Sequence, residues 1–157
     1  LFLVSDSAGS VSLHLELIEQ CFLHQKFAKE TINFNSHTSM PTILHVVLEK
    51  FEKRSSEIAL SLIEKFGNEF SPEVLNYNGY EHRECEDDER LNNLGYGKII
   101  VQAMARHKYD IVLRLLEKCD GFSLGHIEKA RQFAKNNPVP DSVVAALDSY
   151  SRFRFSP

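Results

Sequence analysis

The sequence predicts an all-α fold made of helix pairs that stack on one another. In residues 41–67, apolar side chains recur at helical spacing in two short segments with a break between them. The same layout of apolar residues returns along the chain at intervals of about 31–33 residues. One such pair cannot bury both of its apolar faces, so the recurrence predicts several pairs packed side by side.

The first expected unit covers about residues 8–36. Its apolar residues Val11, Leu13, Leu15 and Leu17 alternate as they would in a strand. A helical stripe fits the same segment, and it consists of Leu13, Leu17, Ile18, Cys21 and Phe22. The segment Leu13–Leu17 matches Leu44–Leu48 at an offset of 31 residues, and this match favours the helix.

The second unit, about residues 39–75, is the clearest. Pro41 suits a first helical turn, where its missing N–H has no partner. Ser55 or Ser56 is expected to cap the second helix, and Gly67 is expected to end it in the left-handed conformation. The expected apolar faces are Ile43, Leu44, Val47, Leu48 and Phe51, followed by Ile58, Ala59, Leu62, Ile63 and Phe66. A short turn capped by Ser71 should follow.

A polar, acidic segment at residues 76–94 interrupts the repeat. Its strongest concentration of charge is Glu84, Glu86, Asp87, Asp88 and Glu89. One interpretation is a solvated loop. The other is an electrostatic contact for a basic partner surface, with Tyr80 and Tyr96 as aromatic anchors at its edges. Tyr80, Glu86, Asp87 and Asp88 are therefore candidate partner-binding residues.

Two further units follow, at about residues 95–120 and 123–151. Their expected helices cover residues 97–106, 110–118, 124–136 and 141–150. Ile111–Leu116 repeats the layout of Ile58–Ile63, and Asp141 or Ser142 is expected to cap the last helix. Residues 149–157 read as a polar, basic and aromatic tail, and a more polar outer face is typical of a capping repeat.

This period, with two helices per unit, resembles the ankyrin repeat. In that family a T-P-L-H-x-A segment opens the first helix, and I-V-x-x-L-L lies in the second. Residues 40–45 (MPTILH) look like the opening segment with one extra residue, and residues 98–103 (KIIVQA) keep its shape without the histidine. The glycine expected between the helices is absent, and His107-Lys108 occupies that turn in the third unit. The resemblance implies an ankyrin-like solenoid of about four repeats with an acidic loop insertion.

The resemblance also implies roles for individual residues. The family's histidine is structural and links adjacent turns by hydrogen bonds, which implies this role for His14 and His45. The family binds partners through loop tips and exposed positions of the first helices. The corresponding residues are Ser36, His37, Thr38, Glu49, Lys50, Tyr96 and Arg106.

Composition and motifs exclude several function classes. A net charge of −4 gives no basic field for nucleic acid, and no apolar run nears the roughly 20 residues that span a bilayer. No phosphate-binding, nucleophile-elbow or metalloprotease motif is present. Cys21-x-x-His24 and His82-x-x-Cys85 offer two ligands each, whereas a structural zinc site takes four. We therefore expect no enzyme activity, no metal and no cofactor.

The predicted function is a protein–protein interaction module. Three cysteines, an odd number, fit a reducing compartment, so we expect the cytoplasm, or a host cytosol for a secreted effector. The chain begins at Leu1, which predicts a piece of a longer protein. One alternative is a regulatory or structural appendage of an enzyme whose catalytic domain lies elsewhere. Another is a non-ankyrin helical domain with its own enzymatic pocket.

Overall fold

The computed structural model describes residues 32–33, 42–48, 53–78 and 93–156, together with residues 20 and 90. These residues contain helices and turns and no strand, which confirms the all-α prediction for this part of the chain. The elements are α3 (Ile43–Leu48), α4 (Lys53–Phe66), the 3-10 helix η1 (Gly67–Glu69), α5 (Pro72–Leu75), α7 (Ile99–Ala105), α8 (Tyr109–Lys118), α9 (Leu124–Asn136) and α10 (Asp141–Phe155).

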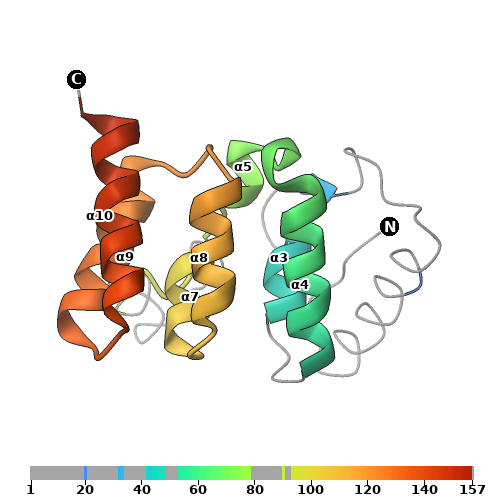
Figure 1. Cartoon of the computed structure of the whole chain (residues 1–157), viewed down its shortest axis with the longest axis horizontal. Coiled ribbons are helices and arrows are strands. Elements are labelled where there is room, and N and C mark those ends of the chain that lie inside the picture. Colours follow the sequence, from blue (N-terminus) through green and yellow to red (C-terminus); the bar gives the residue numbers. More distant parts are fainter. Residues whose placement is uncertain are drawn as a thin grey trace.

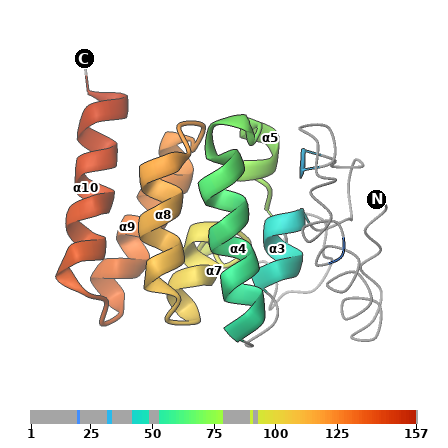
Figure 2. The same ribbon diagram turned by 45° about the vertical axis from the view of Figure 1, so that its right-hand side comes forward.

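The helices are arranged in two layers (Figures 1 and 2). Helices α4, α8 and α10 stand side by side in one layer, and α3, α7 and α9 form the other layer. Each helix of the first layer packs against its partner in the second, as α3 with α4, α7 with α8 and α9 with α10. Successive pairs also touch within each layer, because α8 contacts both α4 and α10, and α7 contacts both α3 and α9.

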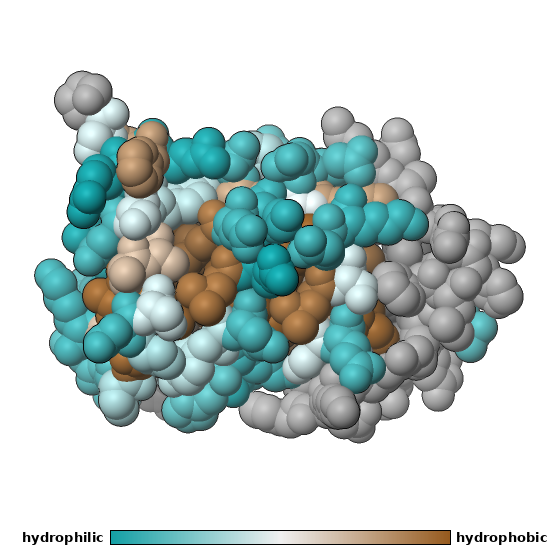
Figure 3. Space-filling model, viewed as in Figure 1, coloured by the Kyte–Doolittle hydropathy of each residue, from teal (hydrophilic) through white to brown (hydrophobic). Residues whose placement is uncertain are grey.

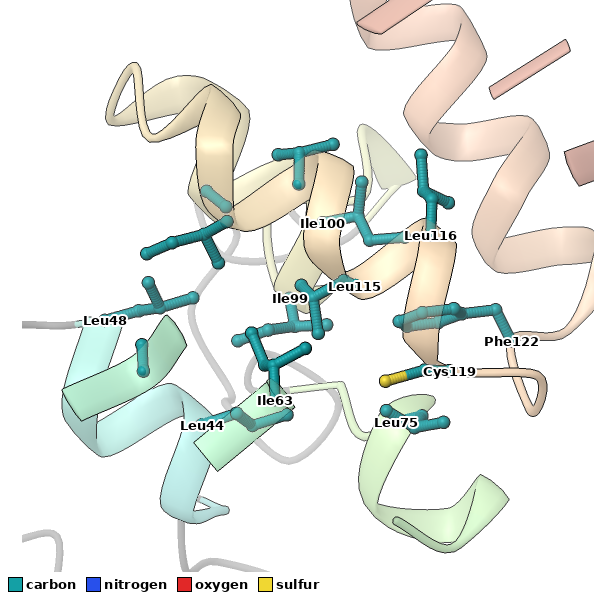
Figure 4. Close-up of a cluster of buried hydrophobic side chains, with 14 of the residues drawn as sticks. Leu44, Leu48, Ile63, Leu75, Ile99, Ile100, Leu115, Leu116, Cys119 and Phe122 are labelled. Carbon is teal, nitrogen blue, oxygen red and sulfur yellow. The ribbon is translucent and has the colours of Figure 1, made fainter. Parts of the chain in front are cut away.

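The core is a continuous strip between the two layers. Figure 4 shows Leu44, Leu48, Ile63, Ile99 and Leu115 converging from both layers. All of the predicted apolar faces of α3 and α4 are buried, apart from Phe51, which lies outside the described residues. Leu62 and Leu115 are completely buried, at equivalent places in α4 and α8.

Most helix boundaries agree with the sequence pattern. Helix α9 begins and ends at the predicted residues, and α7 and α8 differ from their predicted ends by one or two residues. The Ser71 cap is confirmed, because its side-chain oxygen accepts a hydrogen bond of 3.3 Å from the Val74 N–H. Sequence periodicity therefore locates the helices that contribute to the core.

The predicted tail at residues 149–157 is wrong, because α10 continues to Phe155. Tyr150 is buried on this extension, and the rings of Tyr150 and Phe155 lie 6.2 Å apart. The Arg154 guanidinium lies over the Tyr150 ring at 5.6 Å. Arg152 and Arg154 also place positive charge at the negative end of the helix dipole. These contacts stabilise the last turn of α10, which continues past the buried residue Tyr150.

Two of the predicted caps are also wrong. Helix α4 begins at Lys53, so Ser55 and Ser56 lie inside its first turn. Helix α10 has Pro140 at its N-cap position and no side-chain cap, so Asp141 and Ser142 are its first helical residues. Polar residues near a helix start were plentiful in both places, and the sequence pattern did not select among them.

Gly67 has a different role from the one predicted. Its φ is not positive, whereas the left-handed conformation occurs at Gly95 (φ 85). A Cβ atom on Gly67 would lie 2.6 Å from Lys118 Cβ and 2.8 Å from the Lys118 carbonyl oxygen. The glycine therefore permits the ends of α4 and α8 to approach closely.

Replacing Gly67 by alanine is expected to lower the free energy of unfolding by about 1–3 kcal/mol, because the added methyl collides with backbone that must move. Urea denaturation measures this loss. Gly125→Ala is the matched control, because no atom lies within 4 Å of its added Cβ, and alanine should stabilise α9 by about 0.5–1 kcal/mol. Equal effects of the two variants would contradict the close approach at Gly67.

The turn between α7 and α8 has a left-handed residue that is not glycine. His107 has φ 58, and its Nδ1 lies 2.8 Å from the Tyr109 hydroxyl. A side chain in this conformation costs on the order of 1–2 kcal/mol. The backbone of this turn therefore has a conformation that favours glycine, although the residue at this position is histidine.

The open face of the last helix pair is polar. At an offset of 32 residues, Asp148 of α10 stands where α8 has the buried Leu116. Arg131 of α9 donates a hydrogen bond of 3.0 Å to the Asp148 carboxylate. An ion pair therefore occupies the face on which a further helix pair would have to stack.

Candidate interaction surface

Most of the predicted contact residues lie outside the residues that the structure describes. These are Ser36, His37, Thr38, Glu49, Lys50, Tyr80, Glu86, Asp87 and Asp88, together with the predicted structural residue His14. Their roles stay predictions. Tyr96, Arg106 and His45 lie within the described part.

Tyr96 and Arg106 both pack into the fold. Tyr96 is half-buried, and its ring meets the Phe133 ring edge-on at 5.7 Å. Arg106 is also half-buried, and its guanidinium donates a hydrogen bond to the Leu48 carbonyl. This bond connects the ends of α7 and α3. Neither side chain is free of contacts within the chain.

His45 connects the start of α3 to the segment before α7. Its Nε2 lies 3.2 Å from the Gly97 carbonyl, which only accepts, so Nε2 carries the proton. Its Nδ1 lies 2.7 Å from the Thr42 hydroxyl and accepts from it. Burial lowers the pKa of His45 to about 4, and the positive charges of Arg106 and Lys98 act in the same direction. The ring is neutral at neutral pH.

Asn76 and His126 form a second connection, which the sequence pattern did not reveal. The Asn76 amide donates to the Pro72 and Gly121 carbonyls at 2.9 and 2.8 Å. Its side-chain oxygen accepts from the Ser123 N–H at 2.8 Å and lies 3.3 Å from His126 Nδ1. One side chain thus holds together α5, the connector before α9 and the first turn of α9.

His126 has the opposite tautomer to His45. Its Nε2 accepts from the Ile100 N–H at 3.4 Å, so the proton is on Nδ1, which faces Asn76. Burial lowers the pKa of His126 to about 3, and Lys98 and His45 contribute in the same direction. A second proton would remove the acceptor of the Ile100 N–H.

Asn33 repeats the contact pattern of Asn76. It donates to the Glu69 carbonyl and accepts from the Ser71 N–H, each at 2.6 Å. A sequence signal for this repetition exists, because Ile32-Asn33-Phe34-Asn35 resembles Leu75-Asn76-Tyr77-Asn78. This signal depends on asparagine residues, whereas the repeat pattern described above consists mainly of apolar residues.

An apolar groove lies between α8 and α10 on the outer face. Its volume is about 290 Å³. The lining residues are Leu113, Leu116, Glu117, Ala146, Ser149, Tyr150, Phe153 and Arg154. Figure 3 shows hydrophobic surface between these two helices, with hydrophilic side chains around it. Phe153 lines the groove and is 80% exposed.

A smaller hollow of about 140 Å³ lies between α9 and α10. It is lined by Arg131, Ala134, Lys135, Val144, Leu147 and Asp148. The Arg131–Asp148 ion pair described above belongs to this hollow. Arg131 and Asp148 already pair with each other there, so the α8–α10 groove is the stronger candidate for binding.

The described residues contain no cluster of metal ligands, and their one cysteine is buried. They contain no group of three histidine, cysteine, aspartate or glutamate side chains that could hold a metal ion. Cys119 is a buried free cysteine, and burial raises the pKa of its thiol to about 12, so it is a poor nucleophile. The pairs Cys21–His24 and His82–Cys85 lie outside this part of the chain.

Two further findings concern membrane-spanning helices and similarity to known proteins. Among the helices that the structure describes, none has the length and apolar character needed to cross a membrane. Searches of protein-family models, curated proteins and solved structures found no match for this chain.

Proposed function

We propose that this chain is an ankyrin-like solenoid that binds another protein. Three features support the architecture. Helix pairs follow one another in two layers, buried histidines connect one pair to the next, and Asn33 and Asn76 hold successive connectors in the same way. In such a stack each unit contacts only its neighbours, and the result is a long surface.

The main observation in support of a binding function is the apolar groove between α8 and α10. Phe153 is 80% exposed beside an apolar floor, and aromatic anchors next to an apolar hollow are typical of protein interfaces. The groove is shallow and its volume is at the low end of small-molecule sites, which favours a protein partner. The acidic segment at residues 84–89 remains a second predicted contact, for a basic surface.

The cytoplasm is part of the same proposal. Cys119 is free and buried, and the cysteine count is odd, which favours a reducing compartment.

Affinity capture with matched variants tests the binding function. Phe153→Asp should reduce capture of a specific partner at least tenfold, because the aromatic anchor is lost from an exposed site that the fold does not need. Gln132→Asp, an exposed change on α9, is the control and should capture the partner as the unmodified chain does.

Circular dichroism and thermal melting should show that both variants are folded. A folded Phe153→Asp variant that captures the same proteins in the same amounts would remove the support for this surface.

A further inference from the structure

The two helix seams of the outer layer, α4–α8 and α8–α10, have matching residues on their first helix. Leu60, Ile63 and Glu64 of α4 correspond to Leu113, Leu116 and Glu117 of α8 at the offset of 53 that relates the two helices. Leu113, Leu116 and Glu117 line the α8–α10 groove. The same apolar and acidic residue types therefore recur at both seams.

Cations of α8 bridge the α4–α8 seam. Arg114 and Lys118 of α8 both reach Glu64, each at 3.6 Å. Their long hydrocarbon stems begin on α8 and end at a carboxylate on α4, so they cross the seam. Apolar floors are commonly covered by such stems while the charged head stays in water.

The α8–α10 groove has no such cover. At the offset of 32 that relates α8 to α10, Ala146 stands in the place of Arg114 and Tyr150 in the place of Lys118. Within the described part of the chain, Glu117 forms an ion pair with Arg114 of its own helix at 3.1 Å, and Arg114 is shared with Glu64. The carboxylate thus faces the groove without a cation from α10.

We propose that this groove receives an arginine side chain of the partner protein, in the position that Arg114 holds at the α4–α8 seam. This inference rests on the proposed binding function. The stem of the arginine lies over Leu116 and Ala146, and its guanidinium meets the Glu117 carboxylate. The exposed ring of Phe153 offers a face for the planar guanidinium, which favours arginine over lysine.

The positive charge already in the groove is neutralised. Arg154 lines one end, where its guanidinium donates to the Asp120 carboxylate and lies over the Tyr150 ring. Its charge is therefore compensated at that end, while the part of the groove next to Glu117 and Ala146 is free of cations from α10.

An intramolecular test places the arginine in the groove directly. Ala146→Arg should raise the midpoint of thermal unfolding by about 1–3 °C, because the new side chain can reach Glu117 as Arg114 reaches Glu64. Glu117→Gln combined with Ala146→Arg should cancel this rise. Ala145→Arg, an exposed neighbour on α10, is the control and should give no rise that depends on Glu117.

An intermolecular test uses a capped Leu-Arg-Leu peptide and its neutral isostere Leu-citrulline-Leu. In an NMR titration of the full chain, the arginine peptide should shift the amide signals of Leu116 and Ala146 and bind at least fivefold more tightly than the citrulline peptide. The preference should disappear in Glu117→Gln and in Ala146→Arg.

The outcomes separate this inference from the broader function. Equal binding of the two peptides, or shifts away from the groove, would overturn the arginine site even if Phe153→Asp still abolishes capture of a partner. A dependence on Glu117 in both tests would support it even if the partner's main contacts lie elsewhere.

Discussion

Leu115→Ala is expected to lower the free energy of unfolding by about 2–5 kcal/mol. Leu115 is completely buried in α8, which lies between α4 and α10 and packs against α7. Truncation removes the transfer free energy of the side chain and leaves a cavity that helices on three sides must close. The position is therefore one where collapse of the cavity is difficult, and urea denaturation measures the loss.

Two further variants serve as an equivalent site and as a control for Leu115→Ala. Leu62→Ala should cost a similar amount, because Leu62 has the equivalent buried place in α4. Leu124→Ala should change stability by less than about 0.5 kcal/mol, because Leu124 is 44% exposed at the start of α9. A loss at Leu115 as small as that at Leu124 would mean that the inner face of α8 is assigned incorrectly.

Acid is expected to destabilise the fold by about 4 kcal/mol between pH 7.5 and pH 5, through His45 and His126. Both pKa values fall on folding, from about 6.5 to about 4 for His45 and about 3 for His126. Below pH 6.5 the unfolded chain binds protons at these sites and the folded chain does not. Stability is therefore complete above pH 6.5 and is lost as the pH falls toward the folded pKa values, with each ring contributing about 2 kcal/mol at pH 5.

The structure explains why neither ring accepts a second proton. His126 Nε2 is the acceptor for the Ile100 N–H, and both rings lie near the cation of Lys98. Denaturation at several pH values measures the slope. His126→Gln should reduce that slope by about half, whatever its effect on stability at pH 7.5. A flat profile in the unmodified chain would contradict the two buried neutral rings.

The spacing of apolar residues predicted the helix positions, because each helix buries a face formed by its own apolar side chains. The faces of α3 and α4, and the bounds of α9, follow from spacing within a few turns. Caps were less predictable, since several polar residues precede α4 and α10 and packing decides where each helix begins. The role of Gly67 could not be predicted, because it depends on the close approach of the end of α8 in the folded chain.

The candidate site was largely beyond the sequence pattern. The connection from Asn76 to Ser123 joins residues 47 positions apart, and no local rule pairs them. The groove requires that α10 continue past Tyr150, whereas those residues were interpreted as a tail. The sequence does show that Ala146 of α10 corresponds to Arg114 of α8 at the offset of 32. The importance of this difference is apparent only from the structure, in which Arg114 reaches Glu64.

The charged face of α9 and α10 bears on how this protein can be lengthened by engineering. Adding a helix pair beyond α10 would desolvate Arg131 and Asp148 and leave Val144 as the main apolar contact. Splicing a duplicate of the α7–α8 pair between α8 and α9 would instead keep the existing seam with α9 and α10, and its one new seam would lie away from Arg131 and Asp148. Insertion between existing helix pairs is thus a less costly way to lengthen the described array than addition beyond α10.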